Sequence, residues 1–124
     1  RLCLASAGHP EPWLLDRRGV ARRIEVDGVA PGLIKSAIYE SVKFELVQGE
    51  RLLLMTDGLD PADLSGGGRL PDWLADAFAG AAPLPTSEAA GSIGAAIERQ
   101  LMPEQIDDWT IVLLEAIEAP PARR

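Results

Sequence analysis

The chain has 124 residues, of which 47% are hydrophobic and 25% charged, a balance that predicts one folded domain with an apolar core. Twelve basic and nineteen acidic residues give a formal net charge of −7, which is unfavourable for binding nucleic acid or an anionic membrane surface. We therefore expect neither partner. The apolar stretches are too short to span a membrane and no signal peptide is evident, so we expect a cytoplasmic protein.

The first half of the chain predicts a series of short strands. Turn-forming residues separate apolar runs at 2–6, 12–15, 20–26 and 38–47, a spacing that favours an antiparallel meander. Polar and apolar residues alternate in the last of these runs, as in a strand with one solvated face. The run Leu52–Met55 does not alternate, which indicates a strand that is covered on both faces.

The cysteine content bears on both the first strand and the cellular compartment. Cys3, the one cysteine, lies within the first apolar run, where a small hydrophobic residue is typical of a buried strand. Because one cysteine cannot form an internal disulfide, the composition also fits a reducing compartment.

Two helices are predicted in the second half. Apolar residues recur at helical spacing over 70–78, where Pro71 can begin a helix and Gly80 can end it. A second helix is expected from a capping residue at Thr86 or Ser87 to about residue 101, because apolar residues recur there at four-residue steps.

A last buried strand is expected over residues 109–117, and residues 118–124 have the composition of a disordered tail. Strands grouped before helices, with a final strand returning to the sheet, indicate an α+β fold. An alternating, doubly wound fold does not fit this order. We therefore expect residues 1–117 to form one domain or part of one.

Acidic residues stand at the adjoining ends of the two most apolar strands. Asp57 and Gly58 follow the run Leu52–Met55, and Asp107 and Asp108 precede the last strand. If these strands are antiparallel neighbours, Asp57 can face Asp107 or Asp108. Close carboxylates repel unless one is protonated or a cation lies between them, and oxygen ligands suit Mg²⁺ or Mn²⁺. The alternative is an ordinary tight turn and a solvated acidic loop.

Two further features have weaker interpretations. His9 is the single histidine, and without cysteine or histidine partners it is a poor transition-metal site. The simpler interpretation is that His9 lies in a turn at the end of a strand, and the alternative is a catalytic role. A basic cluster brackets a predicted turn and could bind a phosphorylated or acidic partner, or could simply be solvated. It consists of Arg17, Arg18, Arg22 and Arg23.

Four short motifs follow one another along the chain. They are Ala7-Gly8-His9-Pro10, Ala30-Pro31-Gly32-Leu33, Thr56-Asp57-Gly58-Leu59 and Asp107-Asp108-Trp109-Thr110. In this order they resemble the C-terminal half of a protein phosphatase 2C-like (PPM-type) serine/threonine phosphatase, and most of all its bacterial stage II sporulation protein E branch. The resemblance implies part of a four-layer α-β-β-α sandwich with antiparallel sheets.

The resemblance also implies an activity, which is hydrolysis of phosphoserine or phosphothreonine in a protein substrate by a metal-bound water, in bacterial signalling. The complete domain holds two Mn²⁺ or Mg²⁺ ions. By motif match, Asp57 and Asp107 correspond to two ligands of one ion, while Gly58, Asp108 and His9 are possible further site residues.

The remaining metal-binding acids of the family belong to the N-terminal half of the domain, which this chain lacks. We therefore expect that half, or a partner chain, to complete the site. The alternative is a non-catalytic interaction module that retains the phosphatase scaffold.

Overall fold

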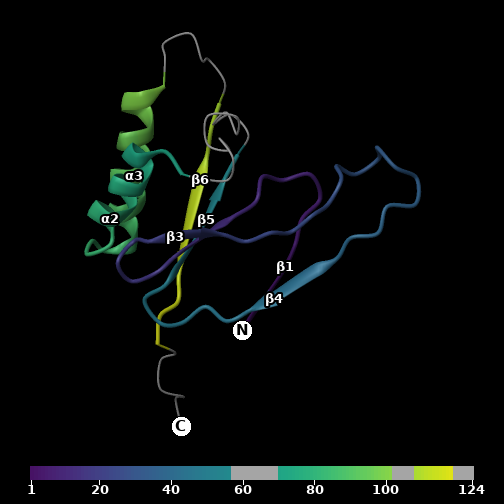
Figure 1. The fold of residues 1–124 in the computed structure, drawn as a ribbon, viewed down its shortest axis with the longest axis horizontal. Coiled ribbons are helices and arrows are strands. Elements are labelled where there is room, and N and C mark those ends of the chain that lie inside the picture. The colour runs from purple at the N-terminus through teal and green to yellow at the C-terminus, as the bar shows by residue number, and fades with distance from the viewer. Residues whose placement is uncertain (57–69, 102–107, 119–124) are drawn as a thin grey trace.

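A computed structural model of the chain describes residues 1–56, 70–101 and 108–118. Within these ranges five strands precede two helices and a sixth strand follows them, which confirms the predicted α+β class (Figure 1). The elements are β1 (Leu2–Ala5), β2 (Trp13–Leu15), β3 (Ala21–Arg23), β4 (Ser41–Phe44), β5 (Arg51–Met55), α2 (Asp72–Ala81), α3 (Thr86–Gln100) and β6 (Ile111–Glu115).

The strands form two antiparallel sheets. Four of them lie in the order β3-β2-β5-β6, and β1 and β4 form a separate two-stranded ribbon. The predicted meander is therefore wrong for β1, whose partner is the distant β4 and not β2. Backbone hydrogen bonds beyond β3 explain the departure: Ile24 N–H donates to Pro12 O at 2.8 Å, and Gly8 N–H donates to Gly28 O at 2.8 Å. They hold the segment after β3 against the segment between β1 and β2, so the chain leaves the four-stranded sheet there and β4 pairs with β1.

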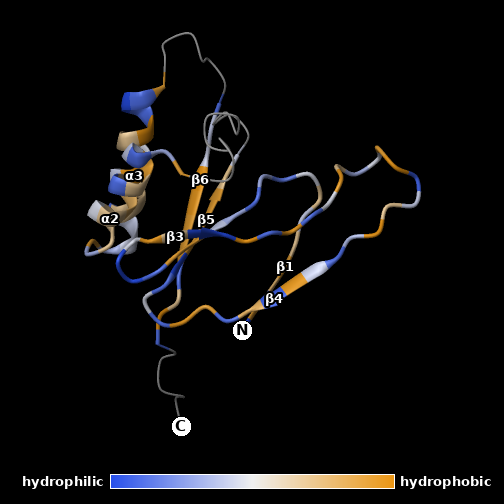
Figure 2. Ribbon diagram, viewed as in Figure 1, coloured by the Kyte–Doolittle hydropathy of each residue, from blue (hydrophilic) through white to orange (hydrophobic). Residues whose placement is uncertain are grey.

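Both helices pack on one face of the four-stranded sheet. Leu74 and Phe78 of α2 and Ile93 of α3 are fully buried against the sheet, in one cluster with Leu53 of β5. In Figure 2 the strands β5 and β6 are mostly hydrophobic, whereas each helix carries both hydrophobic and hydrophilic residues, as expected for helices with one face on the sheet. Among the described residues, neither helix combines the length and apolarity needed to cross a membrane.

The ribbon packs on the opposite face of the same sheet. Leu52 of β5 and Leu14 of β2 are buried there, in contact with apolar side chains of β1 and β4. Because Leu52 faces the ribbon and Leu53 faces the helices, the prediction that β5 is covered on both faces is confirmed. The described part thus stacks helices, sheet and ribbon in succession, and the complete four-layer sandwich stays a prediction.

Two predictions of burial are wrong. Residues of β6 that face away from the helices, Val112 and Leu114, are 44% and 47% exposed, because the ribbon covers the sheet over β2 and β5 and not over β6. Cys3 is also exposed, since β1 alternates in burial and turns only Leu2 and Leu4 towards the sheet. The predicted disordered tail, residues 118–124, lies outside the described residues except for Glu118.

Candidate functional site

The pairing of β5 with β6 decides where the acidic segments of the sequence can meet. The two strands are antiparallel neighbours, with Met55 opposite Ile111 and Arg51 opposite Glu115. The C-terminal end of β5 therefore lies beside the N-terminal start of β6. This confirms the condition under which Asp57, two residues after Met55, was expected to approach the acids that precede β6.

Two threonines join the strands at this end. Thr56 N–H donates to Thr110 O at 3.0 Å, and Thr110 N–H donates to Thr56 Oγ1 at 2.8 Å. The Thr56 hydroxyl also donates to Thr110 O, at 3.4 Å. This Thr56–Thr110 pair was not identified as a positioning element from sequence, although a threonine stands in each of the two acidic motifs and could have indicated it.

The candidate ligands themselves fall mostly beyond this pair. Asp57, Gly58 and Asp107 lie outside the described residues. Asp108 is described and exposed, two residues before Thr110. Within the described ranges, no three His, Cys, Asp or Glu side chains are grouped closely enough to hold a metal ion. Metal binding therefore stays a prediction, for which the all-carboxylate donor set suits a hard divalent cation.

His9 lies in a tight turn after β1. Its ring Nδ1 lies 2.8 Å from Pro10 O, its own backbone carbonyl accepts a hydrogen bond from the Ser6 hydroxyl at 3.1 Å, and the side chain is exposed. Gly8 has a φ of +80°, and a Cβ there would lie 2.8 Å from Ala30 Cα. These contacts favour the turn interpretation of His9, and they bring two of the four motifs, those around His9 and Ala30, side by side.

The arginine cluster does not form a free basic patch. Three of its four members bind neighbouring groups of the same chain, which leaves Arg22 as the member for which the described residues show no such bond. The pairs are Arg17 Nε to Gln48 O at 2.8 Å, Arg18 to Asp16 at 3.4 Å and Arg23 to Glu11 at 2.9 Å.

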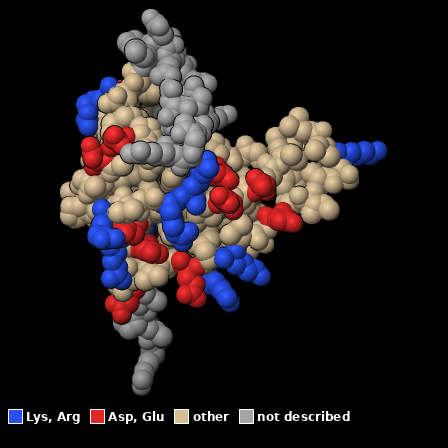
Figure 3. All heavy atoms as spheres, in the orientation of Figure 1, with Lys and Arg blue, Asp and Glu red and all other residues tan. Residues whose placement is uncertain are grey.

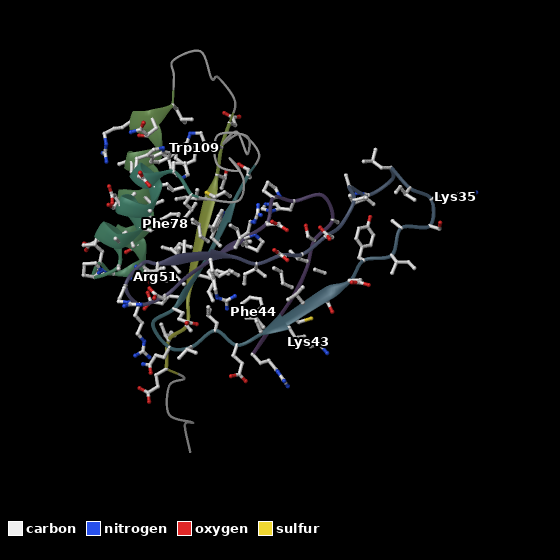
Figure 4. All side chains as sticks on the ribbon, in the orientation of Figure 1. Lys35, Lys43, Phe44, Arg51, Phe78 and Trp109 are labelled. Carbon is white, nitrogen blue, oxygen red and sulfur yellow. The ribbon has the colours of Figure 1, made fainter. Side chains whose placement is uncertain are left out.

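A buried arginine fixes the other end of the β5–β6 pair to the helices. Arg51 Nε donates to Glu115 Oε2 at 3.0 Å, and its terminal nitrogens donate to the carbonyls of Ala81, the last residue of α2, and of Leu84, in the loop before α3 (Figure 4). The Thr86 hydroxyl also donates to Glu115, so it does not cap α3, which Pro85 precedes without a side-chain cap. Sequence analysis missed this group of contacts, because its members are far apart along the chain.

The same contacts act on the charge of Glu115. The Thr86 hydrogen bond is the largest influence and lowers the pKa of the Glu115 carboxyl; desolvation opposes it, and the hydrogen bond and charge of Arg51 add to the lowering. Glu115 is therefore held as a carboxylate between a cation and a hydroxyl donor. This arrangement fixes the register of β5 and β6, and with it the position of the Thr56–Thr110 pair at their far end.

Comparison with known proteins identifies the family of this chain. The family model described as Stage II sporulation protein E (SpoIIE) matches residues 1–117. Neither the curated proteins nor the solved structures contain a significant match. The matched range includes all four motifs and every described helix and strand, so the family assignment rests on nearly the whole sequence and not on one motif.

Proposed function

The chain belongs to the stage II sporulation protein E family of protein phosphatase 2C-like phosphatases, and on that premise we propose that it forms part of a metal-dependent protein serine/threonine phosphatase. The observation that carries the proposal is the Thr56–Thr110 pair, which joins the two strand ends adjoining the acidic motifs. Thr56 directly precedes Asp57 and Thr110 follows Asp108 by two residues, and a preorganised metal site needs the backbone next to its ligands to be held rigidly.

In this proposal, Asp57 and Asp107 hold Mn²⁺ or Mg²⁺, with Asp108 as a further oxygen donor. When bound, such ions supply an activated water and neutralise charge on the phosphoryl oxygens of a phosphoserine or phosphothreonine. The chain's own contribution is to orient the two carboxylates through the β5–β6 register. Gly58, which has no side chain, allows close approach of the substrate phosphate.

Even with Asp108, these carboxylates are too few for a two-metal site, because each hard divalent cation takes about six or more oxygen ligands. We therefore propose that the N-terminal half of the family's domain, in the same polypeptide or as a partner chain, provides the other acids. The substrate is a phosphorylated protein of a bacterial signalling system in the cytoplasm, and neither nucleic acid nor membrane is a partner of this acidic chain.

The test is Mn²⁺-dependent hydrolysis of a phosphoserine peptide by this chain joined to the family's N-terminal half. We expect activity there and none from the 124-residue chain alone. Asp57→Asn should lower activity by more than about 100-fold, since even groups that only orient a ligand are worth about 10–100-fold. Asp76→Asn, at an exposed position of α2, is the matched control and should leave the activity unchanged.

An extended chain that folds but hydrolyses no phosphoserine peptide would contradict the proposal. It would favour the non-catalytic interaction module instead. Activity of the 124-residue chain alone, lost in Asp57→Asn, would show that the N-terminal half is not needed.

A further inference from the structure

The segment between β3 and β4 projects from the rest of the molecule. Residues 27–40, here called the arm, contain neither helix nor strand and extend away from the helices (Figure 1). In the described part of the chain, five of the ten exposed large hydrophobic residues lie in the arm. They are Val29, Leu33, Ile34, Ile38 and Tyr39, with Ile38 88% and Leu33 76% exposed. Apolar surface concentrated in this way marks an interaction site.

The base of the arm is firmly attached. Gly8 N–H donates to Gly28 O at 2.8 Å, and a Cβ at Gly28 would lie 1.8 Å from Ser6 O, so the two segments touch along their backbones. Two turns follow within the arm, closed by Leu33 N–H to Ala30 O at 3.3 Å and by Ala37 N–H to Ile34 O at 3.4 Å. The exposed apolar side chains are therefore presented by an ordered loop.

A hollow of about 610 Å³ lies in the arm between these side chains and two acids. Its lining includes Val29, Ile34 and Ile38 together with Asp27 and Glu40. Both acids are exposed, and neither forms a salt bridge with any residue that the structure describes. Figure 3 shows acidic side chains near the base of the arm, with basic side chains beside some of them, and an uncharged surface between them and the tip.

The basic residue of the arm does not neutralise these acids. Lys35 lies at the tip and points away from the molecule (Figure 4), and it is not among the residues that line the hollow. The hollow thus combines aliphatic walls with two carboxylates that form no salt bridge within the described part of the chain. An apolar segment with a positive charge complements both features, whereas an acidic segment would be repelled.

We propose that the arm is a docking surface for a polypeptide segment of a partner protein that carries aliphatic side chains and a lysine or arginine. The aliphatic side chains fill the hollow beside Val29, Ile34 and Ile38, and the cation pairs with Asp27 and Glu40. The proposal rests on the residues of the arm alone and does not depend on phosphatase activity.

The test is NMR titration of the chain, labelled at isoleucine methyl groups, with a short peptide of leucine and lysine. We expect saturable shifts of the Ile34 and Ile38 methyl signals and none for the core residues Ile93 and Ile97. A peptide with glutamate in place of lysine should bind at least about tenfold more weakly, because it would place like charges next to two carboxylates.

Variants separate this surface from unspecific binding. Glu40→Gln and Ile38→Ser should each weaken binding of the leucine–lysine peptide at least about threefold, while the fold, followed by circular dichroism, is retained because both side chains are exposed. Glu45→Gln removes an exposed acid that does not line the hollow and should have no effect.

Three outcomes would overturn the proposal. The first is equal binding of the two peptides. The second is a shift confined to methyl groups outside the arm, such as Ile111 or Ile117. The third is a dependence of the Ile34 and Ile38 signals on protein concentration without peptide, which would identify a second copy of the chain as the occupant.

Discussion

Both faces of the four-stranded sheet carry apolar residues, but the helices cover β5 and β6 alike, whereas on the ribbon-facing side Leu14 and Leu52 are buried and β6 is left open. On the helix-facing side, Leu53 is fully buried, whereas Val112 and Leu114 on the other side are 44% and 47% exposed. The helices extend over both β5 and β6, while the ribbon contacts β2 and β5. An apolar residue of this sheet is therefore buried only where another layer covers it.

The largest expected effect is on the helix-facing side. Phe78→Ala removes a fully buried ring between α2 and the sheet and should lower the free energy of unfolding by about 3–5 kcal/mol. Urea denaturation followed by circular dichroism measures this change. A loss no greater than that of an exposed-face variant would show that the two faces do not differ in packing.

Arg51→Met removes the group that connects this same face to the helices. The change leaves the Ala81 and Leu84 carbonyls without this donor and leaves the Glu115 carboxylate with the Thr86 hydroxyl alone, so we expect a loss of about 1–3 kcal/mol. The same denaturation experiment reports it. Arg51→Lys is the informative control, because it keeps the charge but cannot make the three-way contact; full stability of that variant would contradict the assigned role.

The pKa of Glu115 predicts a smaller effect that depends on pH. Because folding lowers this pKa from an ordinary value of 4.5, Glu115 contributes stability above that pH and loses the contribution as the pH falls through its folded-state pKa. The free energy of unfolding of the wild-type chain should therefore exceed that of Glu115→Gln at pH 7 and approach it towards pH 3. Parallel pH profiles of the two proteins would contradict this assignment.

The smallest effect is expected on the open face. Val112→Thr keeps the shape of a half-exposed side chain and should change the free energy of unfolding of this chain by about 0.5 kcal/mol or less. When the N-terminal half of the domain is joined to the chain, a larger loss in the same variant would show that this half covers β6. An equal loss in both contexts would show that this face stays exposed.

Much of the fold could be predicted from local pattern. The helical spacing that begins at Leu70 predicts α2, and the unbroken apolar run at Leu52 predicts the doubly covered β5; both are confirmed. The antiparallel pairing of β5 and β6 was a condition of the metal-site hypothesis and is confirmed as well. The ligands Asp57 and Asp107 remain predictions, because they lie outside the described residues.

By itself, the sequence determined the secondary structure, the family and the acidic motifs, since these depend on residues that are close together along the chain. Only the tertiary structure decided that β1 pairs with β4, that Cys3 is exposed, and that Arg51 binds Glu115 across 64 positions of sequence. Local periodicity shows which face of an element is apolar. It carries no information about which distant element covers that face.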